Sequence, residues 1–332
     1  MESRSQVSVS LIIPIYNVAP YIERCLKSVM SQTYDHFECI LVDDASPDES
    51  VEICERMISE YRGNTAFRVL HHSQNKGLSA ARNTGTKTAS GDYVLYVDSD
   101  DLISNDCVEK LVEPVSKDPS VEMVLGQVMR YTDEGGFDQK HYYCRSEEDV
   151  TPSQNVRNLY LNRNHPFPSA AWNKLISKSF IEKHNLLFKE GQIWEEILWT
   201  FFVMKHLSHL YIIPDITYFY CIREGSICKG IKEEELNRHK CEVFNIISKN
   251  LTLGEEDQES ALFAKDFNYS FIRQPRTLQN LATARRFSRS MSVGKYPIEK
   301  KLLRAACLLP RTVKGKEAFF KYEKRLRSFR EG

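Results

Sequence analysis

The sequence has no long hydrophobic run. Its first apolar stretch, Val7 to Ile15, is interrupted by Pro14 and is too short to span a bilayer or to serve as a secretion signal. We therefore expect a cytoplasmic chain. It also lacks repeats and low-complexity tracts, and 42% hydrophobic with 27% charged residues is ordinary for a globular protein. This composition disfavours a disordered or fibrous class.

Paired cysteines are missing as well, because no two of them are spaced as Cys-x-x-Cys. Their number is odd, and they are scattered along the chain: Cys25, Cys39, Cys54, Cys107, Cys144, Cys221, Cys228, Cys241 and Cys307. This pattern argues against a zinc site or a dithiol redox centre. We expect reduced, mostly buried thiols.

Two glycine fingerprints of nucleotide-binding proteins are absent. There is no Gly-x-Gly-x-x-Gly, the mark of dinucleotide-binding folds, and no Walker loop, the mark of P-loop NTPases. Both oxidoreductase and NTPase functions are therefore disfavoured.

The net charge is zero, because a basic C-terminal part balances an acidic remainder. From Tyr269 onward there are 17 Lys and Arg against 4 Asp and Glu, and the remainder carries 28 against 41. Apolar residues in this tail alternate with the cations as in amphipathic helices, which suits either an anionic membrane surface or packing on the rest of the protein. No nucleic-acid-binding module accompanies the charge, so no nucleic acid partner is expected.

What the sequence does contain is an alternation of strand and helix patterns. Apolar runs predict strands at 9–15, 37–42, 67–71, 93–97 and 121–129, and helical spacing predicts helices at 21–31, 49–61, 78–88 and 106–116. Such alternation predicts an α/β fold with a mostly parallel sheet and helices on both faces. From residue 233 onward only helices are expected, at 233–250, 257–270, 275–291, 297–309 and 314–328.

Aspartates follow two of the predicted strands, at Asp43-Asp44 and at Asp98-Ser99-Asp100-Asp101. The carboxyl ends of parallel strands meet at one rim, where such sheets bind ligands. Residues two apart on an extended segment point the same way, so Asp98 and Asp100 can offer two carboxylates to one Mg²⁺ or Mn²⁺ that also contacts a diphosphate. A solvated turn is the alternative.

Other residues at this rim suit a nucleotide. Asp44 can accept the imide N–H of a pyrimidine base, Tyr16 can stack on the base, and Arg82 can bind a donor phosphate or ribose. Each also has an ordinary structural explanation. Asp43 and Asp44 can cap the next helix, Tyr16 can simply pack, and Arg82 can belong to a well-packed helix.

Four blocks in this order resemble a family 2 glycosyltransferase. They are Ser10-Leu-Ile-Ile-Pro-Ile-Tyr-Asn17, Leu41-Val-Asp-Asp-Ala-Ser46, Asn75-Lys-Gly-Leu-Ser-Ala-Ala-Arg-Asn83 and Gly91-Asp-Tyr-Val-Leu-Tyr-Val-Asp-Ser-Asp-Asp101. The resemblance implies an inverting enzyme with a GT-A type mixed, mostly parallel sheet at residues 1–230. Residues 231–332 then form a basic, helical C-terminal extension.

The resemblance also implies roles for residues of the donor site. The second carboxylate of the Asp-x-Asp motif, Asp100, binds Mn²⁺ or Mg²⁺, and the first, Asp98, lies near the metal or the donor ribose. Asp44 corresponds to the base-binding aspartate, and Asp43 and Asp101 are weaker matches. The remaining residues expected to contact the nucleotide-sugar, with UDP favoured as the nucleotide, are Pro14, Tyr16, Arg82, Ser99 and, on a loop after the last strand, Arg223.

For the acceptor side, the resemblance points to the segment Gly191-Gln-Ile-Trp-Glu-Glu-Ile-Leu-Trp199. Glu196 corresponds to the general base, although the family more often has Asp there, and Glu195 is the alternative. Trp194 and Trp172 are expected to contact the acceptor, with core packing as the rival explanation for such tryptophans. Lys174 is assigned either a structural or an acceptor-side role.

The function expected is therefore transfer of a sugar from a nucleotide diphosphate to an acceptor hydroxyl, on a glycan or a lipid-linked acceptor in cell-surface polysaccharide or glycolipid synthesis. A peripheral position on the inner face of the cell membrane would suit such an acceptor. A sugar nucleotidyltransferase is one alternative, disfavoured because no glycine-rich basic loop follows the first strand. The other is a non-catalytic nucleotide- or sugar-binding protein that has lost the base.

Overall fold

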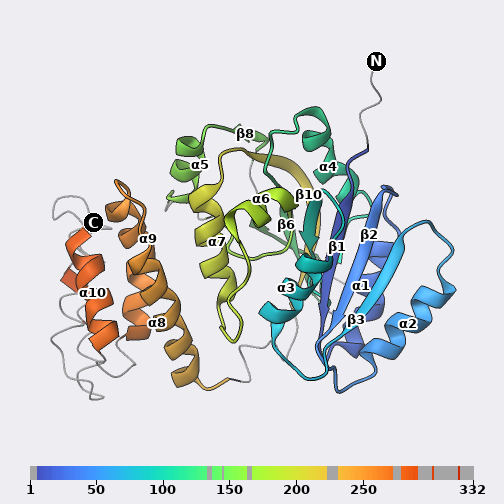
Figure 1. Ribbon diagram of the computed structural model, residues 1–332, viewed down its shortest axis with the longest axis horizontal. Helices are drawn as coiled ribbons and strands as arrows, with labels where there is room; N and C mark the ends of the chain where they lie inside the picture. The colour runs from blue at the N-terminus through green and yellow to red at the C-terminus, as the bar shows by residue number, and fades with distance from the viewer. Residues whose placement is uncertain are drawn as a thin grey trace. The chain divides into compact units, whose positions relative to one another are not determined.

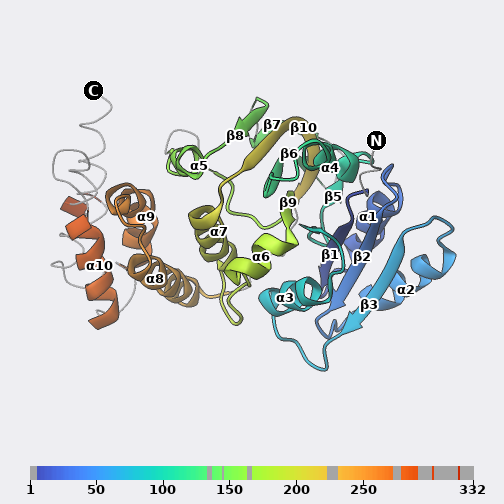
Figure 2. The same ribbon diagram turned by 45° about the horizontal axis from the view of Figure 1, so that its top comes forward.

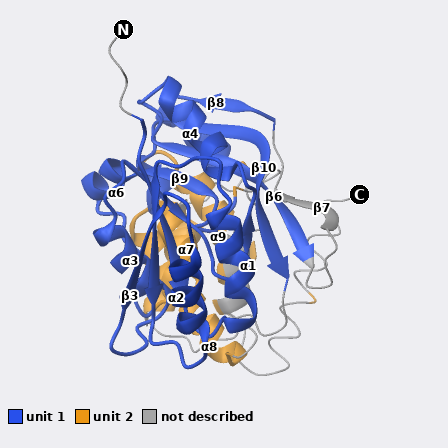
Figure 3. Cartoon of the chain, turned by 90° about the vertical axis from the view of Figure 1, so that its right-hand side faces the viewer, with its two compact units in different colours: residues 1–160, 168–191, 202–224 blue, residues 161–167, 192–201, 225–332 orange. Residues whose placement is uncertain are grey.

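The computed structural model describes residues 6–132, 137–143, 146–162, 167–222, 231–271 and 278–290, together with 301–302 and 321. The chain divides into two compact units, coloured separately in Figure 3. The first comprises residues 1–160, 168–191 and 202–224, and the second residues 161–167, 192–201 and 225–332. The predicted division between residues 230 and 231 differs from this one chiefly in two short segments, 161–167 and 192–201, which belong to the second unit. Among the described helices, none combines the length and the hydrophobicity that a bilayer-spanning segment requires.

The N-terminal part of the first unit alternates strands and helices in the predicted order (Figure 1). Its elements are β1 (Val9–Ile15), α1 (Ala19–Met30), β2 (Phe37–Asp43), α2 (Ser50–Glu60), β3 (Ala66–His71), α3 (Leu78–Thr88), β4 (Tyr93–Tyr96), β5 (Leu102–Ile103), α4 (Cys107–Lys117) and β6 (Met123–Thr132). The short strand β5 was not predicted, because two residues are too few to show a period.

The sequence after β6 completes the sheet. Its pattern predicted a long loop or hairpin from Gly135 to Pro152, followed by an irregular stretch, and the antiparallel pairing of β7 with β6 agrees with the hairpin. This part of the chain contains β7 (Phe137–Tyr143), β8 (Glu148–Val150), α5 (Ser153–Tyr160), β9 (Lys174–Ser177), α6 (Lys178–His184), α7 (Glu195–His206) and β10 (Leu210–Ile222). Helix α7 begins in the second unit and ends in the first. The later elements were not predicted, because β8 and β9 are short and α7 is apolar nearly all round.

The ten strands in the described part of the chain belong to one mixed sheet, in the order β3-β2-β1-β4-β9-β6-β10-β5, with β7 beside β6 and β8 beside β10. Strands β1 to β4 pair in parallel, whereas β9 runs antiparallel between β4 and β6. The parallel half confirms the predicted α/β class. It also brings the carboxyl ends of β1, β2 and β4 to one rim.

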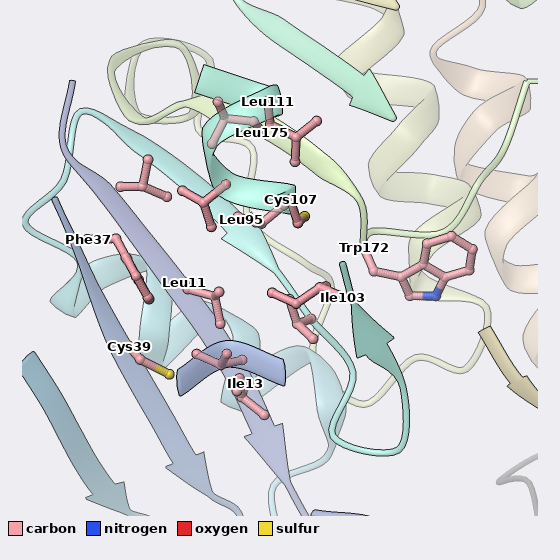
Figure 4. Close-up of a cluster of buried hydrophobic side chains, with 14 of the residues drawn as sticks. Leu11, Ile13, Phe37, Cys39, Leu95, Ile103, Cys107, Leu111, Trp172 and Leu175 are labelled. Carbon is pink, nitrogen blue, oxygen red and sulfur yellow. The ribbon is translucent and has the colours of Figure 1, made fainter. Parts of the chain in front are cut away.

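The two faces of strand β1 are covered by different helices. Odd-numbered residues of β1 join a buried cluster with α1, α2 and α4, partly drawn in Figure 4. The other face carries α3, whose Gly85 approaches Ile12 so closely that a Cβ there would lie 2.4 Å from Ile12 Cγ2. All six cysteines whose surroundings are described are buried free thiols, as expected: Cys25, Cys39, Cys54, Cys107, Cys221 and Cys241.

The second unit contains three described helices that follow one another, α8 (Glu233–Lys249), α9 (Glu256–Phe271) and α10 (Leu278–Ser290), which lie side by side in Figures 1 and 2. They share a phenylalanine core, in which the Phe267 ring lies 5.2 Å from Phe271 and 5.5 Å from Phe287. Three helices predicted at 233–250, 257–270 and 275–291 are thus confirmed within a few residues. The two predicted at 297–309 and 314–328 lie almost entirely outside the described residues.

Candidate active site

The rim opens where β1 and β4 separate, at Pro14. The carbonyl of Ile12 accepts from Val97 N (3.0 Å) on the β4 edge, and residues two apart share an edge, so Pro14 faces β4 as well. Proline has no N–H to donate, and the β1–β4 register ends at Ile12 and Tyr96. The loops after both strands are thus free of ladder bonds and available for a ligand.

The loop after β1 is braced by the loop after β2. Asn17 N donates to Ser46 Oγ (2.8 Å), and Ala19 N donates to Asp48 Oδ2 (2.8 Å). Asn17 has φ +53°, a left-handed turn that asparagine tolerates. Tyr16, just before this turn, remains 46% exposed. The structure therefore places its ring at the surface of the rim, where a base could stack, and not in the core.

Asp44 holds the segment that leads into α3. Its side chain is 2% exposed, and its oxygens accept from Lys76 N (2.8 Å) and Gly77 N (2.6 Å). His72 Nδ1 lies 2.7 Å from Oδ1. Asp44 is not the N-cap of α2, since that residue is Glu49, and the side chain that accepts from Ser50 N at the helix start is that of Asp48 (3.2 Å). The contact of Asp44 with a nucleotide base stays a prediction. The structure adds that Asp44 holds the 72–77 segment together with His72, a residue that the sequence did not single out.

Three aspartates after β4 form an acidic cluster, which we call the carboxylate cluster: Asp98, Asp100 and Asp101. One carboxylate oxygen from each lies within 4.8 Å of the others. Carboxylate oxygens are the ligands that Mg²⁺ and Mn²⁺ prefer. Asp98 and Asp100 are partly exposed, and Ser99 between them is 6% exposed. The residues present therefore fit a hard divalent cation, with Asp98 and Asp100 as its accessible carboxylates.

Arg82 brings a positive charge to this cluster from α3. Its Nη2 lies 2.7 Å from Asp98 Oδ1, and its guanidinium lies 5.3 Å from the centre of the Phe188 ring. The side chain is 3% exposed. Such a paired, packed arginine orients Asp98. The predicted contact with a donor phosphate is not tested by this arrangement.

Asp101 is the most buried of the three aspartates and serves as an anchor. Its oxygens accept from Tyr218 Oη (2.6 Å) and from Cys221 N (2.8 Å), both on β10. The same Tyr218 hydroxyl accepts from Asp98 N (3.2 Å). Burial, then the neighbouring carboxylates of Asp100 and Asp98, raise the pKa of Asp101 well above its usual range. Tyr218 therefore fixes both ends of the Asp-x-Asp-Asp loop, a role with no signal in the sequence.

Trp172 packs against Tyr218, the residue that bonds Asp101. Its ring is stacked on Tyr218, with centroids 4.4 Å apart and an angle of 6°, and it is 6% exposed. Trp199 is 3% exposed. For these two tryptophans the structure favours core packing, the alternative left open by the sequence, because little indole surface remains for an acceptor. Lys174, 1% exposed with its ammonium bonded to the Ala170 carbonyl, lies in a structural position too.

The second unit contains the predicted base. Glu195 and Glu196 form the first turn of α7, and Glu195 is 6% exposed whereas Glu196 is partly exposed. Trp194, immediately before them, has φ +67°, a conformation that costs a bulky residue free energy. The Lys240 ammonium of α8 lies 4.4 Å from the centre of its ring. Arg223, also predicted for the donor site, lies outside the described residues.

These features define an α/β protein with an acidic, oxygen-donor site at the carboxyl ends of its parallel strands. The family model described as "Glycosyl transferase family 2" matches residues 10–175, and the chain belongs to this family. It is similar to glycosyltransferase GlyG of Streptococcus pneumoniae, with 30% identity over 71% of this chain and 78% of that one.

Two solved structures share the fold. S. aureus TarS (residues 1–349), in complex with UDP-GlcNAc, superposes with a TM-score of 0.69 at 20% identity over 98% of this chain and 92% of TarS. The mannosyltransferase PcManGT of Pyrobaculum calidifontis, in complex with GDP-Man and Mn²⁺, gives a TM-score of 0.55 at 17% identity over 96% of this chain and 79% of the other. The chain is therefore a glycosyltransferase with the GT-A fold.

Proposed function

We propose that this glycosyltransferase moves a sugar, with inversion, from a UDP-sugar to the hydroxyl of a glycan or lipid-linked acceptor in cell-surface polysaccharide or glycolipid synthesis. The observation that carries the donor assignment is the carboxylate cluster with Arg82 beside it. The exposed Tyr16 at the same rim supports a base site. TarS, which has the same fold, binds UDP-GlcNAc.

In the proposed reaction Glu196 takes the proton of the acceptor hydroxyl, with Glu195 as the alternative base. The acceptor oxygen forms a bond to the anomeric carbon from the face opposite the leaving group. The bond between that carbon and the diphosphate oxygen breaks, and the diphosphate leaves with the electron pair. Configuration is therefore inverted in one displacement.

Asp98 and Asp100 are proposed to hold Mn²⁺ or Mg²⁺. A bound divalent ion supplies positive charge that stabilises the departing diphosphate. Arg82 and Asp101 keep the loop of these two carboxylates in place, through the bonds to Asp98 and to Tyr218. Contacts of Pro14, Asp44, Ser99 and Arg223 with the nucleotide-sugar remain part of the proposal.

Calorimetric titration of UDP, GDP and dTDP, with and without Mn²⁺, tests the donor site. We expect one nucleotide, UDP, to bind only with Mn²⁺, and Asp100→Ala to remove this binding. Asp118→Ala is the matched control, because Asp118 is an exposed aspartate at the end of α4, away from the cluster, and its loss should leave nucleotide binding unchanged. Metal-independent binding by the wild type, or intact binding by Asp100→Ala, would contradict the assignment.

A proposed peripheral position on the membrane rests on the basic tail. Of its residues from 291 onward the structure describes only three. Sedimentation with anionic and with neutral vesicles would test it, and equal binding to both would count against an electrostatic role.

A further inference from the structure

Two buried hydrogen-bond donors and one partly exposed ammonium of the second unit have no acceptor among the described residues. The Trp194 Nε1 and the Asn237 Nδ2 are buried and have no partner within the described part of the chain. Asn237 is only 3% exposed. The ammonium of Lys240 forms no ion pair with any carboxylate that the structure describes. Buried donors without acceptors cost free energy, so each such group calls for an explanation.

Lys240 lies against Trp194, and Asn237 is one turn away from Lys240 on the same helix. Lys240 Nζ is 4.4 Å from the centre of the Trp194 ring. Asn237 precedes Lys240 by three residues on α8, so both side chains share one face of that helix. The nearby acidic residues of α8 are taken up elsewhere, since Arg238 pairs with Glu242 (2.9 Å) and with Glu235 (3.6 Å). These two carboxylates therefore leave the Lys240 ammonium without an ion pair in the part of the chain that the structure describes.

The backbone just before α7 is strained and is held in place by bonds to α8. Trp194 has φ +67°, although tryptophan disfavours the left-handed region. The preceding residues are clamped to α8, as Gln192 Nε2 donates to the His239 carbonyl (3.0 Å) and Ile193 N to His239 Nδ1 (3.4 Å). Strained backbone that is held by such bonds is typical of functional sites. Here it sets Trp194 directly before the proposed base, Glu195-Glu196.

We propose that Lys240, Asn237 and Trp194 bind an anionic group of the acceptor, a phosphate or a carboxylate. Such a group supplies the acceptor oxygens that these three donors lack, and its negative charge matches the unpaired ammonium. This inference rests on the proposed function, because it places the group beside the proposed base. It also changes the role expected for Trp194, since Lys240 covers one face of the indole on which a sugar was expected to stack.

Ligand-observed NMR titrations of the full chain test the site, with glycerol 3-phosphate and glucuronate as anionic probes and glycerol and glucose as their uncharged counterparts. We expect the wild type to bind at least one anion and neither uncharged compound. The anion that binds identifies the group as a phosphate or as a carboxylate. Lys240→Met should weaken that binding by about tenfold, as expected for loss of a charge-assisted bond, while Lys240→Arg retains it.

Lys249→Met is the matched control, because Lys249 is an exposed lysine on the same helix. It should leave anion binding unchanged. Asn237→Asp places a carboxylate one turn from Lys240, and we expect the new internal pair to abolish binding of the anion. Thermal melting of each variant confirms folding.

Titration of UDP with Mn²⁺ into the same samples separates this inference from the proposed function. Unchanged UDP affinity in Lys240→Met is expected, whereas a loss of UDP affinity in place of anion affinity would show that the cation serves the donor. Equal binding of the anion by wild type and Lys240→Met, or binding of neither anion by the wild type, would overturn the acceptor site. Failure of the wild type to bind UDP would instead overturn the donor assignment.

Discussion

Tyr218 and Asp101 are 117 positions apart in the sequence, yet the tyrosine hydroxyl lies 2.6 Å from the carboxylate. The hydroxyl also accepts from Asp98 N, so one side chain holds both ends of the loop that carries Asp100. Because the loop has no ladder partner of its own, the position of its carboxylates depends on these bonds and on the pair that Arg82 forms with Asp98.

At this scale we predict that Tyr218→Phe weakens Mn²⁺ binding in the presence of UDP by roughly tenfold, which corresponds to about 1.4 kcal/mol. The phenylalanine keeps the stack on Trp172 but leaves the buried Asp101 short of a donor. Electron paramagnetic resonance of free Mn²⁺ measures the affinity without any need for turnover.

Tyr93→Phe provides the matched control. Tyr93 is also buried, and its hydroxyl donates to the Val121 carbonyl (2.9 Å) at the opposite end of the sheet. Tyr93→Phe should lower the free energy of unfolding by about 1 kcal/mol, through loss of one buried hydrogen bond, and should leave the Mn²⁺ affinity unchanged. Equal losses of affinity in both variants would mean that Tyr218 acts only through general stability.

At the scale of elements, the packing of α3 on β1 sets the position of Arg82, and Gly85 makes that packing possible. A methyl group at this position would lie 2.4 Å from Ile12 Cγ2, well inside van der Waals contact. We predict that Gly85→Ala destabilises the protein by about 1–3 kcal/mol, measured by urea unfolding.

The effect of Gly85→Ala on stability should change sign once the Ile12 side chain is shortened. In an Ile12→Ala background, the same Gly85→Ala substitution should be neutral or stabilising by up to about 1 kcal/mol, because alanine is the better helix former. An equal cost in both backgrounds would show that the contact with Ile12 is not what requires glycine at this helical position.

At the scale of the whole molecule, the proposed donor site and the proposed base belong to different compact units. The two functions should therefore separate by mutation. We predict that Glu196→Gln lowers sugar transfer by at least about a hundredfold, as expected for loss of a general base, while UDP and Mn²⁺ still bind as in the wild type.

Glu195→Gln tests the alternative base in the same assay, and Asp100→Ala should remove both transfer and UDP binding. If Glu196→Gln retained full activity and Glu195→Gln lost it, the base would be Glu195. Full activity in both variants would remove this pair from the mechanism.

Much of the candidate site was predictable because its signals are local. Alternating apolar runs specify parallel strands, and aspartates directly after β2 and β4 must then lie at one rim whatever the remaining fold. The Asp-x-Asp spacing indicates two carboxylates that point the same way, and the carboxylate cluster confirms that they lie close together. Family membership followed from the same four blocks.

Other features depended on the tertiary structure, because they arise from contacts between distant segments. An aromatic residue has the same local pattern whether it binds a sugar or fills a core, so only the stack on Tyr218 places Trp172 in the core. Likewise, an Asp-Asp pair does not reveal which carboxylate is buried, and β10 decides that Asp101 is the anchor. Short strands such as β9 form because of their pairing with neighbouring strands, and four residues are too few to show an alternating hydrophobic pattern in the sequence.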